Sequence, residues 1–337
     1  LKAAGEKKLL NAKFYGTEEG KITIGSEEEL KKIMKELEGE SFSVTDIKKG
    51  ERLKKSPVVF TTSTLQQEAS KALNFATSKT MRIAQQLYEG IDIKGNGTVG
   101  VITYLRTDST RVSEEAEGSV RQFVEKQYGE EYVAAGTSKK SGTGKIQDAH
   151  EAIRPTDVSR TPAMLKDSLT RDQFRLYQLI WKRFVASRMQ PARYETTSVR
   201  ISAGRYRFTA AASRIAFDGF RLIYTEAGEE KEEGGVLLKS LAEGAVLTPE
   251  EFDTKQHFTQ PPAHYTEAAL VRTLEELGIG RPSTYAPTIS TIIARRYVAK
   301  ENKNLYMTEL GEVVNHIMKQ SFPSIVDVNF TANMESL

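Results

Sequence analysis

The sequence predicts a multi-domain α+β protein in which two separate strand-rich pieces form one hinge domain around an inserted helical domain. Three observations favour this class. A chain of 337 residues is long enough for two or three domains with their own cores. Apolar residues recur at helical spacing in some segments and alternate with polar residues in others. No apolar run approaches the roughly 18 residues that a membrane-spanning helix needs.

The spacing changes at three places, which divide the chain into four segments. They are a first strand-rich piece at 1–62, an inserted helical domain at 63–190, a second strand-rich piece at 191–256 and a helical C-terminal domain at 257–337. Both helical domains contain short helices with tight connections followed by a strand, a pattern typical of helix-turn-helix and winged-helix units.

The first strand-rich piece begins with a helix at 26–39. Ser26 and Glu29 have the spacing of a capping box at its N-terminus. Residues 41–48 then alternate as a strand does, and the turn-forming composition of 57–64 predicts a hinge.

The inserted helical domain begins its helices at small hydroxyl residues. Three helices are expected to open at Thr64, Ser78 and Ser113, and a longer amphipathic helix covers 170–188. Tyr88 falls on the apolar face of the second of these helices, which predicts an inward-facing ring.

Three other parts of this domain are not helical. A strand is predicted at 99–103, and the turn-forming composition of 136–145 predicts a surface loop. Residues 95–100 match the pattern G-x-G-x-x-G, but they precede a strand, whereas a dinucleotide-binding fingerprint follows one. A glycine turn is therefore the better interpretation.

The second strand-rich piece alternates over 196–224. This pattern predicts a hairpin that turns at Gly204 and places Arg205 and Arg207 on its outer face.

The C-terminal domain returns to helical spacing. Its helices are expected to open at Thr266, Ser283 and Thr308, the last of these being the final helix of the chain. A polar hairpin at 297–306 resembles a wing.

The composition and the motifs of the sequence exclude several kinds of catalytic and metal-binding site. The chain has no cysteine, which excludes disulfides, thiolate zinc sites and cysteine nucleophiles. It has four histidines, no two of which have the spacing of metal ligands. No Walker A sequence is present, so no nucleotide-hydrolysis site is expected. The chain begins at Leu1 without a signal-peptide pattern, and we expect it to be a piece of a longer, cytoplasmic protein.

Charge is distributed unevenly along the chain, although the formal net charge is only +3. Residues 171–214 hold ten basic and two acidic side chains, a local charge of +8, whereas 225–253 hold nine acidic and two basic ones, a local charge of −7. This separation is typical of a protein with a polyanionic partner such as nucleic acid. A solvated helix face followed by an acidic loop explains the same pattern, and charge alone does not decide between them.

The segment 101–111 carries the most informative chemistry. Tyr104 ends an apolar stretch, and Arg106 lies two residues on, on the same side of an extended chain. A phenol of ordinary pKa about 10 is a poor nucleophile at neutral pH. A neighbouring guanidinium favours the phenolate and stabilises a phosphoryl group under attack. Packing plus solvent exposure is the competing explanation.

Two other segments contain polar residues at suggestive places. In 148–156, His150 could bind a phosphate or move a proton, or it could be a half-buried residue of a capped turn. In 278–285, a glycine-rich turn with Arg281 at its mouth leads into a helix, an arrangement that suits phosphate binding but also an ordinary helix–helix corner.

Taken together, these segments resemble the bacterial type IA DNA topoisomerases. The matching stretches are FTTSTLQQEAS (60–70), ITYLRTDSTRVS (102–113), AHEAIRPTD (149–157), FTQPPAHYTEAALVRTLEELGIGRPSTYAPTISTI (258–292) and FTANMESL (330–337). They occur in order along essentially the whole chain. Leu105 stands where the family often has methionine, a change that conserves volume.

The resemblance implies a reaction and its catalytic residues. Tyr104 would attack one DNA strand and form a 5′-phosphotyrosyl link, Arg106 would stabilise the charge on the phosphoryl oxygens, and His150 would contact the phosphate or move a proton. The other strand would pass through the gap before resealing, which relaxes negative supercoils without ATP.

The resemblance also implies the partner and the residues that contact it. The partner would be single-stranded and negatively supercoiled DNA, bound by a monomer in the cytoplasm at the nucleoid. The implied DNA-binding residues are Thr103, Asp108, Ser109, Thr110, Arg111, Arg154, Arg281, Ser283 and Thr284.

The family's cofactor is Mg²⁺, which an acidic D-x-D-x-E cluster of a Toprim domain binds. No D-x-D-x-E occurs in this sequence. We therefore expect a fragment that lacks the Toprim domain, holds no metal, leaves Tyr104 exposed and does not relax supercoiled DNA on its own.

Two alternatives stay open at this point. The topoisomerase half of reverse gyrase shares these motifs. A non-catalytic winged-helix DNA-binding protein would explain the helical patterns, but it gives Tyr104 and Arg106 no reason to lie together.

Overall fold

The structure is a computed structural model that describes residues 1–3, 9–134, 150–227 and 241–336. The predicted loop at 136–145 lies outside these residues. The chain forms two compact units: the first comprises 1–55, 191–218 and 230–260, and the second comprises 56–190, 219–229 and 261–337. Both helices and an antiparallel sheet are present, so the predicted α+β class is confirmed. The three domain boundaries stay predictions.

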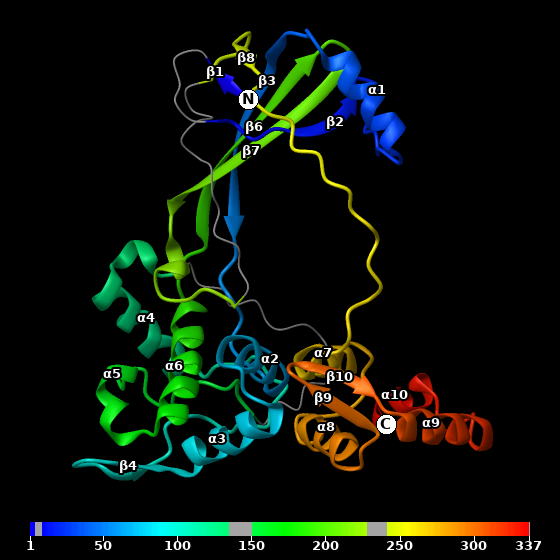
Figure 1. Cartoon of the computed structure of the whole chain (residues 1–337). Helices are drawn as coiled ribbons and strands as arrows, with labels where there is room; N and C mark the ends of the chain where they lie inside the picture. The colour runs from blue at the N-terminus through cyan, green and yellow to red at the C-terminus, as the bar shows by residue number, and fades with distance from the viewer. Residues whose placement is uncertain (4–8, 135–149, 228–240, 337) are drawn as a thin grey trace. The chain divides into compact units, whose positions relative to one another are not determined.

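The first unit is built on a six-stranded antiparallel sheet with strand order β1-β8-β3-β6-β7-β2. Its strands are β1 (Lys2–Ala3), β2 (Lys13–Thr17), β3 (Phe42–Lys54), β6 (Ala192–Ala203), β7 (Tyr206–Phe217) and β8 (Val246–Thr248). Strands β3, β6 and β7 are long neighbours in this sheet (Figure 1). Segments of both strand-rich pieces thus pair in one sheet, with β3 beside β6 over twelve residue pairs.

The predicted hairpin is present, and the backbone conformation of its turn requires glycine at position 204. Strands β6 and β7 are joined by Gly204 and Arg205 alone, and Gly204 has a φ of +54°. A side chain at this position would be strained by the left-handed backbone, and a Cβ would lie 2.8 Å from the Glu40 carboxyl carbon. A two-residue turn that starts with positive φ matches the twist of the two strands.

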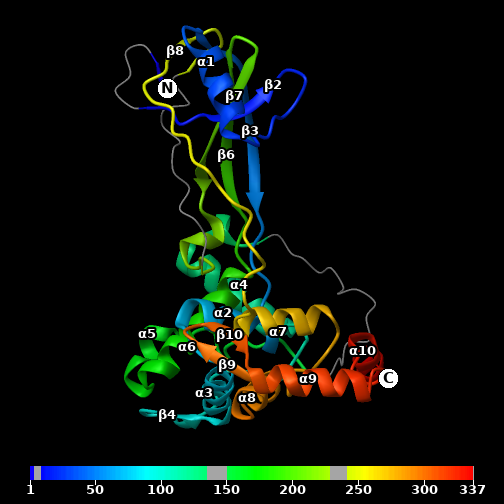
Figure 2. The same ribbon diagram turned by 45° about the vertical axis from the view of Figure 1, so that its right-hand side comes forward.

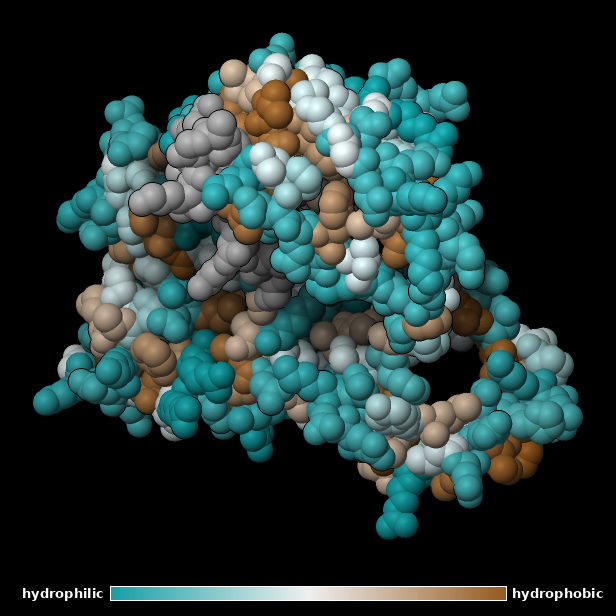
Figure 3. Space-filling model, turned by 45° about the horizontal axis from the view of Figure 1, so that its top comes forward, coloured by the Kyte–Doolittle hydropathy of each residue, from teal (hydrophilic) through white to brown (hydrophobic). Residues whose placement is uncertain are grey.

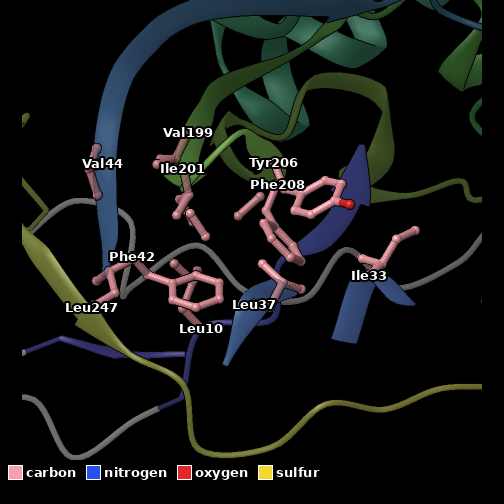
Figure 4. Packing of buried hydrophobic residues seen from close by; sticks show 12 residues of the cluster. Leu10, Ile33, Leu37, Phe42, Val44, Val199, Ile201, Tyr206, Phe208 and Leu247 are labelled. Carbon is pink, nitrogen blue, oxygen red and sulfur yellow. The ribbon is translucent and has the colours of Figure 1, made fainter. Parts of the chain in front are cut away.

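Helix α1 (Glu27–Leu37) closes the core of this unit. Its N-cap, Ser26, accepts a hydrogen bond from the backbone N–H of Glu29, as predicted, while the Glu29 carboxylate accepts one from the N–H of Gly25. Ile33 and Leu37 pack against side chains of the sheet (Figure 4). The buried residues of this core are Leu10, Ile33, Leu37, Phe42, Val44, Val199, Ile201, Ala203, Tyr206, Phe208, Ala210 and Leu247.

The second unit is mostly helical. Its longer elements are α2 (Thr62–Glu68), which continues into the π-helical turn η1 (Ala69–Leu73), α3 (Thr77–Glu89), α4 (Glu114–Tyr128), α6 (Arg171–Ala186), α7 (Glu267–Glu276), α8 (Tyr285–Ala294), α9 (Glu309–Ser321) and α10 (Val328–Ser336). Shorter ones are the hairpin β4 (Ile91–Ile93) and β5 (Gly97–Val99), η2 (Glu130–Tyr132), α5 (Pro162–Leu165), η3 (Lys166–Ser168), η4 (Gly219–Leu222), and the hairpin β9 (Val298–Glu301) and β10 (Asn304–Met307). Helices α7, α8 and α9 lie with the β9–β10 hairpin in Figure 2, so the predicted wing is present.

Three helix starts differ from the predictions. Helix α2 is capped by Thr61, whose side chain pairs with Thr64 in a capping box, because Thr61 is still extended while Thr64 is already inside the helix. The N-cap residues of α3 and α8 are Ala76 and Thr284, and neither side chain makes a capping hydrogen bond. Ser78 and Ser283 therefore do not open these helices as predicted. Several hydroxyl residues adjoin each start, and local sequence does not choose among them.

Two further predictions were wrong. The strand expected at 99–103 stops with β5 at Val99, and 101–103 pair irregularly with 154–156 instead. The helix that opens at Thr308 is not the last, because α10 follows it. None of the described helices is long and apolar enough to cross a membrane, and the face drawn in Figure 3 is mostly hydrophilic.

A carboxylate from another helix completes the N-terminus of α3. Glu267, the first residue of α7, is 5% exposed. Its Oε2 accepts hydrogen bonds from the N–H of Thr77 at 2.7 Å and from the Thr77 hydroxyl at 2.9 Å, and its Oε1 accepts one from Lys300 Nζ at 2.6 Å. A negative charge at this end of α3 also interacts favourably with the helix dipole.

These contacts predict a pH dependence of stability. Burial by itself would raise the pKa of Glu267, but the hydrogen bonds from Lys300 and Thr77 outweigh it and hold the pKa below its usual range. An unfolded glutamate has a pKa of about 4.3, so Glu267 stabilises the fold fully above about pH 5, and this contribution is lost as the pH falls through the lower folded pKa.

We therefore expect the free energy of unfolding to fall more steeply below about pH 5 in the native chain than in Glu267→Gln. Urea unfolding at a series of pH values measures this, with Glu276→Gln, an exposed residue of the same helix, as the control. Native and Glu267→Gln curves that run parallel between pH 6 and pH 3 would contradict it.

Candidate active site

Burial alternates along the segment that carries Tyr104. Leu105, Thr107 and Ser109 are buried, whereas Arg106 and Asp108 between them are exposed. Successive side chains of an extended chain point to opposite sides. One edge of the segment is therefore buried in the protein, and the other edge presents charged side chains to solvent.

The N-terminus of α2 fixes the buried edge. The fully buried hydroxyl of Thr62 lies 2.7 Å from the Leu105 carbonyl and 3.1 Å from the Thr107 carbonyl, and it accepts the N–H of Thr107 at 2.9 Å. The N–H of Thr62 donates to the Thr107 carbonyl at 2.9 Å. Four short contacts from one threonine thus hold the backbone on both sides of Arg106. The turn-forming composition of 57–64 predicts only a hinge, and no local pattern indicates this role of Thr62.

Gln66 lies one helical turn after Thr62. Its side chain is fully buried, and in the described part of the chain neither its amide nitrogen nor its amide oxygen has a hydrogen-bond partner. A buried amide without partners costs stability. Such local costs are typical of functional regions.

The second predicted segment runs beside the first. The N–H of Thr103 donates to the Arg154 carbonyl at 2.9 Å, and its hydroxyl donates to the Ala152 carbonyl at 2.7 Å. The N–H of Ala152 in turn donates to the Arg111 carbonyl at 2.8 Å. Two motifs that are far apart in the sequence are therefore joined into one site by backbone hydrogen bonds.

Tyr104 is half-buried between two rings. Its ring centroid lies 4.9 Å from that of His150, with the planes tilted by 42°, and 5.5 Å from that of Tyr88, in an edge-to-face arrangement at 66°. His150 itself is exposed. The structure brings the rings of Tyr104 and His150 together. Tyr104 is less exposed than expected.

The predicted DNA-binding residues of this region fall into two groups. The side chains of Arg106, Asp108, Thr110 and Arg111 are exposed. Others are engaged within the protein: the hydroxyl of Thr103 bonds Ala152, the hydroxyl of Ser109 accepts the N–H of Arg111 at 3.1 Å, and Arg154 forms an ion pair with Glu151 at 2.6 Å.

The third predicted segment is organised by an acidic residue of α10. Glu335 Oε2 accepts the N–H of Gly280 at 2.7 Å and lies 3.3 Å from Arg281 Nη1. The N–H of Arg281 donates to the Thr284 hydroxyl at 2.8 Å. Arg281, Ser283 and Thr284 are exposed. Glu335 lies within the matching stretch 330–337, but no local pattern indicates this contact.

Tyr285 connects this segment electrostatically with the first one. Burial raises the pKa of Tyr285 to about 12, and the negative charges of Glu275 and Asp108 act in the same direction. Glu275 also accepts a hydrogen bond from the hydroxyl of Ser63 in α2, at 2.7 Å. Helix α7, which leads into this segment, therefore contacts α2 through Glu275.

The basic segment 171–214 is largely neutralised within the protein. Five of its arginines have a carboxylate partner among the described residues, in the pairs Arg183–Glu226, Arg188–Glu117, Arg205–Glu36, Arg207–Glu18 and Arg214–Glu195. Arg183 is buried and its Nε also donates to the Val58 carbonyl. Structural pairing therefore accounts for much of this positive charge, and the segment as a whole is not a free basic surface.

The described residues contain no group of three or more histidine, aspartate or glutamate side chains that could hold a metal ion.

Comparison with known proteins gives two findings. A family sequence model described as DNA topoisomerase matches residues 4–337. Among solved structures, the chain is similar to full-length topoisomerase I from Thermotoga maritima, with 40% sequence identity and a TM-score of 0.80. The match covers 97% of this chain and 52% of the other, so this chain spans about half the length of that protein.

The Thr62 contacts predict a specific loss of stability. Thr62→Val keeps the shape but leaves the buried Thr107 N–H without its acceptor, which should lower the free energy of unfolding by about 1–3 kcal/mol. Thr62→Ser retains the hydroxyl and serves as the matched control, with a smaller loss. Urea unfolding of the three proteins measures the difference, and equal losses for valine and serine would show that the hydroxyl is unimportant.

Proposed function

The chain belongs to the bacterial type IA DNA topoisomerase family, and on that premise we propose that Tyr104 is the nucleophile that cleaves one DNA strand. The phenol oxygen attacks a backbone phosphorus and the bond from phosphorus to the 3′ oxygen breaks. The products are a 5′-phosphotyrosyl link and a free 3′-hydroxyl, which takes up a proton in place of the one that the phenol loses.

This chemistry explains how DNA can be resealed without ATP. The phosphodiester is exchanged for a phosphotyrosyl diester, so its bond energy is kept. Attack by the 3′-hydroxyl reverses the step after the other strand has passed through the gap. Repeated cycles relax negative supercoils.

The placement of Tyr104 is the observation that supports the proposal most strongly. Its ring is half-buried, at the start of a segment that is hydrogen-bonded on its inner edge and charged on its outer edge. Arg106 on that outer edge would stabilise the negative charge that builds on the phosphoryl oxygens. His150, whose ring centroid lies 4.9 Å from that of Tyr104, would contact the phosphate or move the proton.

We propose that single-stranded DNA contacts the exposed predicted residues, namely Arg106, Asp108, Thr110, Arg111, Arg281, Ser283 and Thr284. Thr103, Ser109 and Arg154 would instead shape the site, because their polar groups already bond within the protein. We expect the protein to act as a monomer on negatively supercoiled DNA in the cytoplasm.

The proposal assigns Mg²⁺ no ligands in the described residues. In the family this ion is bound by a Toprim cluster, whose D-x-D-x-E pattern the sequence lacks. We expect this polypeptide by itself not to relax a supercoiled plasmid.

Replacement of the nucleophile tests the proposal. In the complete product of the gene that encodes this chain, Tyr104→Phe should abolish the covalent protein–DNA adduct and plasmid relaxation while it leaves the Kd for single-stranded DNA within about twofold, because the phenol oxygen forms the bond but the cationic side chains supply most of the affinity. Tyr15→Phe, an exposed tyrosine elsewhere, is the control.

An adduct that persists in Tyr104→Phe would refute the proposal. A native protein that binds DNA and never forms an adduct would favour a non-catalytic winged-helix protein.

Salt dependence tests the DNA contacts. Each arginine that neutralises a phosphate should contribute about 0.7 to the slope of log K against log salt for single strands. Arg111→Ala should therefore lower the slope by about that amount in fluorescence-anisotropy titrations. Arg207→Ala, which removes an arginine already paired with Glu18, should leave it unchanged. Equal effects of the two variants would argue against a DNA contact by Arg111.

A further inference from the structure

We propose that Tyr88 is a positioning residue that holds the Tyr104 ring in the orientation needed for attack. This inference rests on the proposed function of Tyr104. Tyr88 touches the nucleophile rather than the DNA, and it acts through the edge-to-face contact between the two rings, whose centroids are 5.5 Å apart.

Packing of α3 does not by itself explain Tyr88. The residue lies in the last turn of α3 and is 39% exposed, contrary to the prediction that its ring would face inward. The neighbouring Leu87 is fully buried and supplies the apolar contact of this turn. A large aromatic ring that stays partly in solvent therefore needs a different explanation, and its contact with Tyr104 provides one.

The backbone leading to Tyr104 is fixed against the same turn of the helix. The N–H of Val101 donates to the Leu87 carbonyl at 2.8 Å. A Cβ on Gly100 would lie 2.5 Å from the carbonyl oxygen of Tyr88, closer than real Cβ atoms approach. Only glycine lets the two backbones pass so closely. The backbone at residues 100 and 101, three to four residues before Tyr104, is therefore packed directly against the backbone of Leu87 and Tyr88.

The helix that carries Tyr88 is also held at its other end. Glu267 accepts both the N–H and the hydroxyl hydrogen bonds of Thr77 and pairs with Lys300. Helix α3 is thus attached at its N-terminus to α7 and β9, and at its C-terminus to the segment before Tyr104. A residue on such a helix can define a position more accurately than one on a loop.

For catalysis, the contact with Tyr88 would control the orientation of the Tyr104 ring. Tyr88 and His150 both contact the Tyr104 ring, which restricts its rotation and keeps the phenol oxygen near the path of attack. Misplacement of a reacting atom by about 1 Å can slow a reaction about 100-fold. Loss of the Tyr88 ring should therefore slow the chemical step more than it weakens DNA binding.

The experiment measures single-turnover formation of the covalent adduct in the complete gene product, at saturating single-stranded oligonucleotide. Tyr88→Leu and Tyr88→Met remove the ring, Tyr88→Phe retains it, and Tyr265→Leu is an exposed-tyrosine control. Tm and the Kd for the oligonucleotide are measured for every variant.

We expect Tyr88→Leu and Tyr88→Met to form the adduct about 10- to 100-fold more slowly, with Tm and Kd close to native, and Tyr88→Phe to recover the native rate within about twofold. Native rates in both ring-less variants would overturn the inference, and so would a slow Tyr88→Phe. A parallel loss of rate, Tm and affinity would also overturn it, since that result indicates a purely structural residue.

The variant Tyr104→Phe, measured in the same experiment, distinguishes a wrong nucleophile from a wrong role of Tyr88. If Tyr104→Phe still forms the adduct, the proposed nucleophile is wrong. If it forms none while Tyr88→Leu and Tyr88→Met react like the native protein, only the role of Tyr88 is wrong.

Discussion

The candidate site depends on how an irregular segment satisfies its buried backbone. Residues 101–107 belong to neither a helix nor a regular strand, yet much of their backbone is inside the protein, where unpaired N–H and C=O groups are costly. The N-terminus of α2 and the segment 152–156 supply the missing partners. Because these partners come from two distant parts of the chain, the same bonds that stabilise the segment also bring Tyr104 and His150 together.

Fixing a loop from its inner edge leaves its outer edge free. Buried side chains at Leu105, Thr107 and Ser109 anchor the segment, whereas the side chains of Arg106 and Asp108 are exposed. A site arranged in this way can present a charged side chain to a phosphate without breaking hydrogen bonds inside the protein. By contrast, the arginines Arg183 and Arg188 are paired with carboxylates, and their charge stabilises the fold.

Much of the fold could be predicted from the sequence because it depends on local patterns. Helix α1 and the β6–β7 hairpin follow from apolar spacing together with a suitable cap or turn residue. The errors occurred where local patterns were ambiguous. Thr61 rather than Thr64 caps α2, and 101–103 pair with 154–156 rather than forming a regular strand. For the site, order and spacing of the motifs pointed to Tyr104, Arg106 and His150, whereas Thr62 and Glu335 carry no local signal for their contacts.

The sequence by itself determined the family and the type of most elements, since these depend on residue identity and short-range spacing. Only the tertiary structure decided which groups meet. Glu267 at the start of α3, the Tyr88 ring beside Tyr104 and the carboxylate partners of the arginines all join residues that are distant along the chain. Such contacts depend on the packing of whole elements against one another, and no local pattern specifies it.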